Sequence, residues 1–186
     1  MTKPLITCPA AEVHAALRRP PAFGHHADLT DRLITGPLDL RDQTLCGCDF
    51  SGSVFADDVC FQGAIFRGIS WFQDTMFRQT ADFRSACFWN DARFDRARFH
   101  QTADFPTAEF RGVASFDDIT AHHGLRLTGV LANGNLSLAG STIHGQTDIT
   151  AATLMGGLWA VGANIASLTG AQTSSIHGRV NGIPCP

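Results

Sequence analysis

The sequence predicts an all-β solenoid, and two regularities of residue spacing carry this prediction. Of the fourteen phenylalanines, only Phe23 lies outside a series that runs from Phe50 to Phe116 in alternating steps of five and six residues. Aliphatic residues continue the same frame to about residue 179, at Leu127, Leu138, Ile149, Ala160 and Ala171 in one column and at Ala121, Ala132, Ile143, Leu154, Ile165 and Ile176 in the other. A fixed period over most of a chain is typical of a repeat architecture.

Neither a continuous helix nor a continuous strand explains these steps. In an α-helix, which turns by about 100° per residue, steps of five and six put successive phenylalanines on different sides. In a strand, an odd step reverses the face on which the side chain lies. The spacing is satisfied if the chain turns a corner within each step, so that every centre points toward one common axis.

Small apolar residues stand two positions before many of these centres. They are Ala81, Ala92, Ala103 and Ala114 in one column and Ala64, Ala86, Ala97 and Ala108 in the other. A large centre with a small apolar neighbour suits the interior of a narrow tube. The polar columns between them are expected to face water.

The stretches ADFRSACF (81–88) and ADFPTAEF (103–110) display the repeating unit best. Over about residues 37–179 the chain resembles the pentapeptide-repeat family, whose units read roughly A(D/N)LXX or A(D/N)FXX. The resemblance implies a right-handed quadrilateral β-helix with one pentapeptide on each of four faces. This chain adds a sixth residue to every second unit. At a strand spacing near 4.8 Å, about six coils of about 22 residues make a tower roughly 29 Å tall.

Three parts are expected within a single domain. Residues 1–36 form an N-terminal segment, 37–179 the β-helix and 180–186 a C-terminal tail. The segment PAAEVHAALRR (about 9–19) predicts a helix that caps the tube, because it combines an early proline with strong helix formers and an apolar face at Val13, Ala16 and Leu17. The tail is too short to cover the other end, which predicts a homodimer formed through the C-terminal end.

Charge and composition exclude several function classes. A net charge of −3 and a pI near 6.2 give no hint of a nucleic-acid-binding surface, so no direct nucleic-acid partner is expected. No signal peptide or transmembrane span is recognisable, so we expect a cytoplasmic protein without a membrane partner. The six cysteines show no paired metal-ligand spacing.

One outward column brings histidines into register. Residues 22 apart should lie on the same face in neighbouring coils, which aligns Arg78, His100, His122 and His144 and puts His123 beside the column. Three interpretations stay open: a ladder of stacked polar rings, a metal site shared by His100, His122 and His144, or a pH-sensitive strip. The ladder is the simplest of the three, and no cofactor is expected unless a metal binds this column.

The opposite face aligns Arg67, Trp89 and Arg111, which predicts a cation–π stack along the tower. Packing is the default interpretation of this stack, and contact with a protein partner is the alternative. A further column contains Asp82 and Asp104 and forms a broken acidic stripe, and these two residues are also candidates for contact with a partner.

The resemblance also implies a function class. Family members include quinolone-resistance and topoisomerase-poison self-resistance proteins, which look like duplex DNA in shape and charge and engage DNA gyrase. We therefore expect a non-catalytic binding or scaffold protein, with a gyrase or topoisomerase interaction by DNA mimicry as its most concrete form. The alternative, less favoured, is a small-molecule or metal-dependent enzyme that uses the histidine face, and no catalytic residue is assigned.

Overall fold

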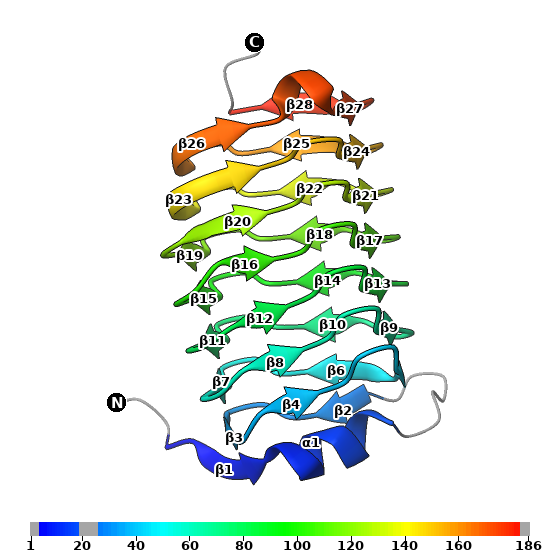
Figure 1. The fold of residues 1–186 in the computed structure, drawn as a ribbon, viewed down its shortest axis with the longest axis vertical. Coiled ribbons are helices and arrows are strands. Elements are labelled where there is room, and N and C mark those ends of the chain that lie inside the picture. The colour runs from blue at the N-terminus through cyan, green and yellow to red at the C-terminus, as the bar shows by residue number, and fades with distance from the viewer. Residues whose placement is uncertain (1–3, 19–25, 183–186) are drawn as a thin grey trace.

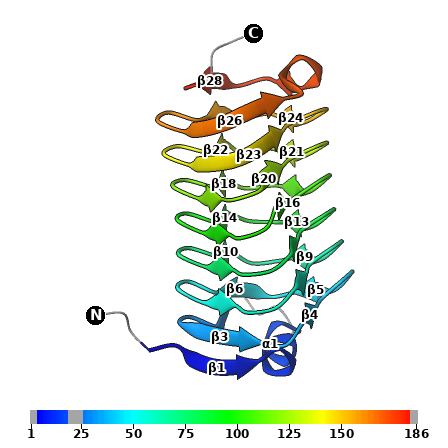
Figure 2. The same cartoon turned by 60° about the vertical axis from the view of Figure 1, so that its left-hand side comes forward.

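The computed structural model describes residues 4–18 and 26–182. They form a parallel β-solenoid that stands as a tower in Figure 1, with the N-terminal end at the bottom and the C-terminal end at the top. Short strands lie on four faces, here named A to D. Each strand pairs in parallel with the strand of the same face in the next coil, as the stacked arrows in Figure 2 show. The predicted four-sided β-solenoid is confirmed.

Face A consists of β1 (Ile6–Pro9), β3 (Arg32–Thr35), β7 (Val54–Phe55), β11 (Met76–Phe77), β15 (Arg98–Phe99), β19 (Thr120–Ala121) and the first parts of β23 (Thr142–Asp148) and β26 (Asn164–Thr169). Face B consists of β4 (Leu38–Asp39), β8 (Val59–Cys60), β12 (Ala81–Asp82), β16 (Ala103–Asp104), β20 (Gly124–Arg126) and the last parts of β23 and β26. The two long strands therefore continue around the corner between these faces.

Face C consists of β5 (Thr44–Leu45), β9 (Ile65–Phe66), β13 (Cys87–Phe88), β17 (Glu109–Phe110), β21 (Leu131–Ala132), β24 (Thr153–Leu154) and β27 (Ser175–Ile176). Face D consists of β2 (His26–Asp28), β6 (Gly47–Asp49), β10 (Ser70–Trp71), β14 (Ala92–Arg93), β18 (Ala114–Ser115), β22 (Leu136–Ser137), β25 (Gly157–Trp159) and β28 (Arg179–Asn181). A short 3-10 helix, η1 (Ala171–Thr173), precedes β27.

Face D has eight strands, so the tower has about eight turns, and the expected number of about six is corrected. The first coil of the tower lies partly within residues 1–36, because β2 and β3 already pair with β6 and β7. The sequence frame missed this first coil because its buried centres are aliphatic: Leu29, Ile34, Leu40 and Leu45. The sequence separation between paired residues of the first and second coils is also one residue shorter than in later coils. Leu38 pairs with Val59, whereas Ala81 pairs with Ala103.

Four columns of phenylalanine rings fill the tube, one from each face. Rings of successive coils stack at centroid distances from 4.6 Å, between Phe66 and Phe88, to 5.3 Å, between Phe50 and Phe72. Rings from opposite faces meet edge to face across the tube, as Phe83 of face B does with Phe94 of face D at 5.4 Å and 84°. Stacked and edge-to-face contacts are both favourable geometries for aromatic pairs. The strictly spaced phenylalanines are therefore the inner wall of the middle coils.

Two kinds of corner join the faces. Each five-residue step turns tightly with a positive φ two positions after the centre, at 55° for Asp74 and 57° for Asp118. The six-residue steps turn more widely, and there the backbones of neighbouring coils approach closely. At Gly134, for example, an added Cβ would lie 2.5 Å from the carbonyl oxygen of Gly112. A glycine is required at that position because no side chain fits between the coils.

The two ends of the tower differ. Helix α1 (Ala10–Leu17) covers the first coil with buried Val13 and Leu17, and the Leu17 carbonyl accepts a hydrogen bond from the Cys46 amide at 3.0 Å. The expected capping helix is thus present, although Arg19 at its expected end lies outside the described residues. At the other end, the apolar centres Ile165 and Ile176 are only half-buried. Most of the expected tail, residues 183–186, also lies outside the described part.

Among residues 4–18 and 26–182, no helix has the length and apolar character needed to cross a bilayer.

Candidate functional site

Face A carries a column of exposed histidines, one from each of three successive coils. His100 follows β15, His122 follows β19 and His144 lies within β23. The ring centroids of His100 and His122 are 5.3 Å apart, and those of His122 and His144 are 5.6 Å apart with 14° between the ring planes. The structure places these side chains as a stack, with Arg78 one coil below and His123 next to His122.

The titratable groups that affect the pKa of His122 are all basic, namely three histidines and one arginine. Partial burial lowers this pKa most, and His100, His144, His123 and Arg98 lower it further, because a positive charge nearby disfavours a second one. Among residues 4–18 and 26–182, no three or more His, Cys, Asp or Glu side chains form a group that could hold a metal ion. The stack therefore does not fit the three-histidine metal site, and we derive no metal-dependent step from it.

Face C carries a tryptophan between two arginines. The guanidinium carbon of Arg67 lies 4.5 Å from the ring centroid of Trp89, and that of Arg111 lies 5.0 Å from it. Trp89 nevertheless remains 40% exposed. Cation–π contacts from the coils below and above thus hold the indole in place while part of its surface stays open to solvent.

Other side chains extend this surface beyond what the sequence analysis singled out. Arg111 Nε donates a hydrogen bond to Glu109 Oε1 at 2.8 Å, which lowers the pKa of the Glu109 carboxyl. Cys87 Sγ lies 3.6 Å from Glu109 Oε2. Leu131 and Met155 are exposed on the same face. Cys87 and Glu109 are 22 residues apart, which is the length of one coil, so this spacing could have predicted that they are neighbours.

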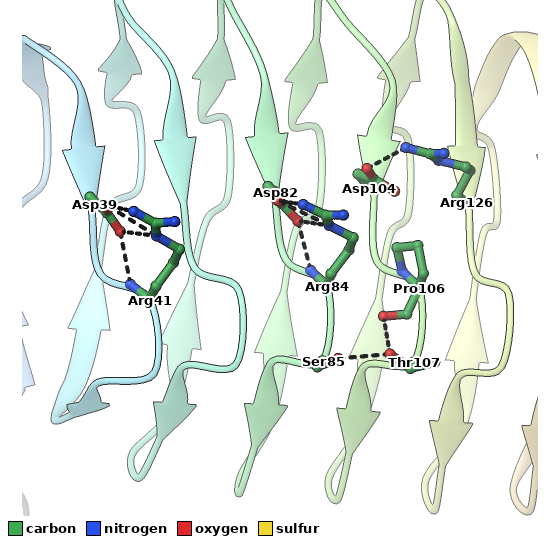
Figure 3. A network of polar contacts seen from close by, with 9 residues as sticks. All are labelled: Asp39, Arg41, Asp82, Arg84, Ser85, Asp104, Pro106, Thr107 and Arg126. Carbon is green, nitrogen blue, oxygen red and sulfur yellow. Dashed lines mark hydrogen bonds and ion pairs between the residues drawn. The ribbon is translucent and has the colours of Figure 1, made fainter.

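The acidic stripe on face B is mostly neutralised, as Figure 3 shows. Asp82 and Asp104 are only 8% and 7% exposed. Arg84 forms an ion pair with Asp82 at 2.7 Å, and Arg126 in the next coil forms a short one with Asp104. Each of these two carboxylates, both candidates for partner contact, is turned toward an arginine of its own chain.

A groove of about 640 Å³ runs along the corner between faces D and A. Carboxylates of successive coils line it, at Asp31, Asp74 and Asp118, together with Arg96 and Arg98. The Asp74–Arg96 ion pair, with 2.7 Å between Oδ2 and Nη2, crosses two coils within this groove. Both residues lie at the same corner position, 22 residues apart and each with a positive φ, so the coil length was the signal that could have aligned them.

Comparison with known proteins identifies the repeat. Residues 61–108 match the family model for pentapeptide repeats (9 copies). Neither the curated proteins nor the solved structures provide a match. The coils before and after residues 61–108 have the same parallel pairing on the same four faces. The match to pentapeptide repeats suggests a non-catalytic repeat protein. The match over residues 61–108 identifies the repeat in this chain as the pentapeptide repeat.

Proposed function

We propose that this protein is a non-catalytic binding rod that contacts a protein partner through face C, with Trp89 at the centre of the contact. The observation that carries this proposal is the exposed indole held between Arg67 and Arg111. Tryptophan and arginine are enriched among the residues that dominate binding energy at protein interfaces. A ring that is already fixed loses little conformational freedom on binding, which lowers the entropic cost of association.

DNA gyrase, or another type II topoisomerase, is the partner that we propose, because the family resemblance implies it. The paired carboxylates of Asp82 and Asp104 supply little of the charge that DNA mimicry needs. Residues 26–58, in contrast, contain seven aspartates and two arginines. We therefore place the DNA-like charge in the first two coils and the apolar contact on face C.

A gyrase supercoiling assay, run with and without a quinolone, tests this partner. We expect the purified protein either to inhibit supercoiling or to protect gyrase from the drug. Trp89→Ala should weaken that effect by at least tenfold in the required concentration, as loss of a hot-spot residue does. Asn133→Ala, an exposed change one coil above Arg111 in the same column, is the matched control and should have no effect. If the wild-type protein shows neither inhibition nor protection, gyrase is not the partner.

We also propose a homodimer formed through the C-terminal end. The strands β26, β27 and β28 are the last of their faces and have no further strand of the described chain above them. The centres Ile165 and Ile176 are half-buried there, and Val180 is 40% exposed. A second copy would cover both the apolar centres and the open strand edges. Analytical ultracentrifugation at micromolar concentration should show a dimer, and a monomer there would remove this proposal.

A further inference from the structure

Positive charge on face A is not balanced as it is at six arginines elsewhere on the tower. On the other faces and at the corners, arginines form ion pairs with carboxylates, at Arg41, Arg84, Arg93, Arg96, Arg111 and Arg126. Within the described part of the chain, Arg78 and Arg98 of face A form no such pair, and the stacked histidines lie beside them. We name this set the cationic strip: Arg78, Arg98, His100, His122, His123 and His144.

The carboxylates nearest in the fold already have partners. At the lower end of the strip, Asp57 Oδ2 accepts a hydrogen bond from the Gly36 amide at 2.7 Å, and Asp58 Oδ1 accepts one from the Thr80 amide at 3.0 Å. On the side of the groove, Asp74 is paired with Arg96. Asp118 also faces the Arg96 guanidinium and raises its pKa, although less than Asp74 does.

The remaining side chains that point outward around the strip are neutral. They are Met76, Gln79, Thr80, Gln101, Thr102, Thr120, Thr142 and Gln146. No carboxylate is among the main groups that set the pKa of His122. An anion that reaches the strip would therefore find donors that no carboxylate of the described chain already occupies.

We propose that the cationic strip binds a small ligand that carries several phosphate groups. Neighbouring rings are 5.3 and 5.6 Å apart, a separation at which two N–H donors can each reach a different oxygen of one phosphate. The strip repeats this arrangement from coil to coil, so several linked phosphates engage several coils at once and gain from multivalency. This site lies on a different face from the protein contact proposed at Trp89.

Binding to the strip should strengthen as the pH falls through the histidine range. Without ligand, the pKa of His122 is lowered, first by partial burial and then by its basic neighbours, so the neutral form is favoured. A bound phosphate reverses this preference by stabilising imidazolium, so binding takes up protons. The two arginines keep their charge at every pH of interest and supply the residual affinity at alkaline pH.

Isothermal titration calorimetry with sodium tripolyphosphate tests the proposal. We expect the wild-type protein to bind at least tenfold more tightly at about pH 5.5 than at about pH 8, the effect of gaining charge-assisted hydrogen bonds from imidazolium. His122→Gln keeps a flat polar side chain but cannot be protonated, and it should lose most of this difference. Arg78→Gln should weaken binding at both pH values. His177→Gln, a lone exposed histidine on face C, is the matched control and should behave as the wild type.

Orthophosphate and a short single-stranded oligonucleotide complete the design. Tripolyphosphate should bind more tightly than orthophosphate, because it reaches more than one coil. Equal affinities at the two pH values, or equal losses in His122→Gln and His177→Gln, would overturn the proposal. Tighter binding of the oligonucleotide than of tripolyphosphate would also overturn it in favour of a nucleic-acid surface. Thermal unfolding of each variant at alkaline pH checks the fold, and His100→Gln replaces any variant that fails to fold.

Discussion

Arg84 folds back over the strand that precedes it and closes a two-point contact with Asp82. Its Nε lies 3.0 Å from Oδ1 and its Nη2 lies 2.7 Å from Oδ2, while its own backbone amide donates to Oδ1 at 3.0 Å. Arg41 makes the same set of contacts with Asp39 two coils below, as Figure 3 shows. The two pairs differ in burial, because the Asp82 side chain is 12% exposed and the Asp39 side chain is 54% exposed.

The difference in burial between these two ion pairs predicts that their loss destabilises the protein to different extents. Arg84→Ala should lower the midpoint of urea unfolding clearly, because it leaves the mostly buried carboxylate of Asp82 without its cation. Arg41→Ala should change the midpoint little, because water solvates Asp39 in its place. Urea titrations followed by circular dichroism measure both. Equal shifts would show that the burial of Asp82 does not decide the strength of the contact.

The aromatic wall predicts a second difference. Phe83 stacks on Phe61 at 5.1 Å and on Phe105 at 4.7 Å, and Leu138 is equally buried in an aliphatic coil. Phe83→Ala should cost about 3–5 kcal/mol of unfolding free energy. This loss of unfolding free energy should be larger than that of Leu138→Ala, because each lost ring pair adds roughly 0.5–1.5 kcal/mol to the cost of the cavity. Chemical denaturation of the two variants gives the comparison, and equal losses would contradict the importance of the ring stacks.

The wide corners predict a strong effect of a single methyl group. In Gly134→Ala the new Cβ would meet the Gly112 carbonyl oxygen at 2.5 Å and its carbon at 2.8 Å. Separating two coils should cost about 1–3 kcal/mol, the usual range for overpacking. Gly162→Ala is the control, since its Cβ has nothing within 4 Å and only the φ of 72° is unfavourable. Thermal unfolding should rank Gly134→Ala as the less stable variant, and the reverse order would argue against close backbone stacking.

The histidine stack predicts a pH dependence of stability in phosphate-free buffer. The pKa of His122 in the folded chain lies below its ordinary value of 6.5. The unfolded chain therefore binds more protons than the folded chain in this range, and the stability present above about pH 6.5 is lost as the pH falls toward the folded pKa. His122→Gln should remove this component. Urea titrations between about pH 8 and pH 5.5 measure it, and identical slopes for the two proteins would contradict the stack.

The carboxylate of Asp148 should affect the stability of the protein in a separate, more acidic pH range. Hydrogen bonds, first of all from the Thr150 hydroxyl, lower the pKa of Asp148 below 3.8. The unfolded chain takes up this proton first, so the stability that Asp148 supplies is lost only as the pH falls below about 3.8. Thr150→Ala should reduce that loss, which acid titrations of the two proteins would show. The His122 effect and the Asp148 effect are thus separable by pH.

Much of the tower could be predicted from residue spacing. The phenylalanine series from Phe50 to Phe116 identified the buried wall, because only a chain that turns at every step can point these rings to one axis. The coil of 22 residues then placed His100, His122 and His144 in one column, and also Arg67, Trp89 and Arg111 in another. These alignments follow from the strict register of parallel strands, which repeats every side chain of one coil directly above the last.

Other features were decided by the tertiary structure alone. The residue spacing did not predict the first coil, because Leu29, Ile34 and Leu40 are aliphatic. The separation between its residues and their partners in the second coil is also one residue shorter than in later coils. The acidic stripe proved to be paired because side-chain direction, which spacing does not contain, turns Arg84 back onto Asp82 and Arg126 down onto Asp104. Residue spacing determined where each side chain stands on this protein, whereas only the packed structure determined which of its charges remain open, because charge pairing depends on rotamers and burial.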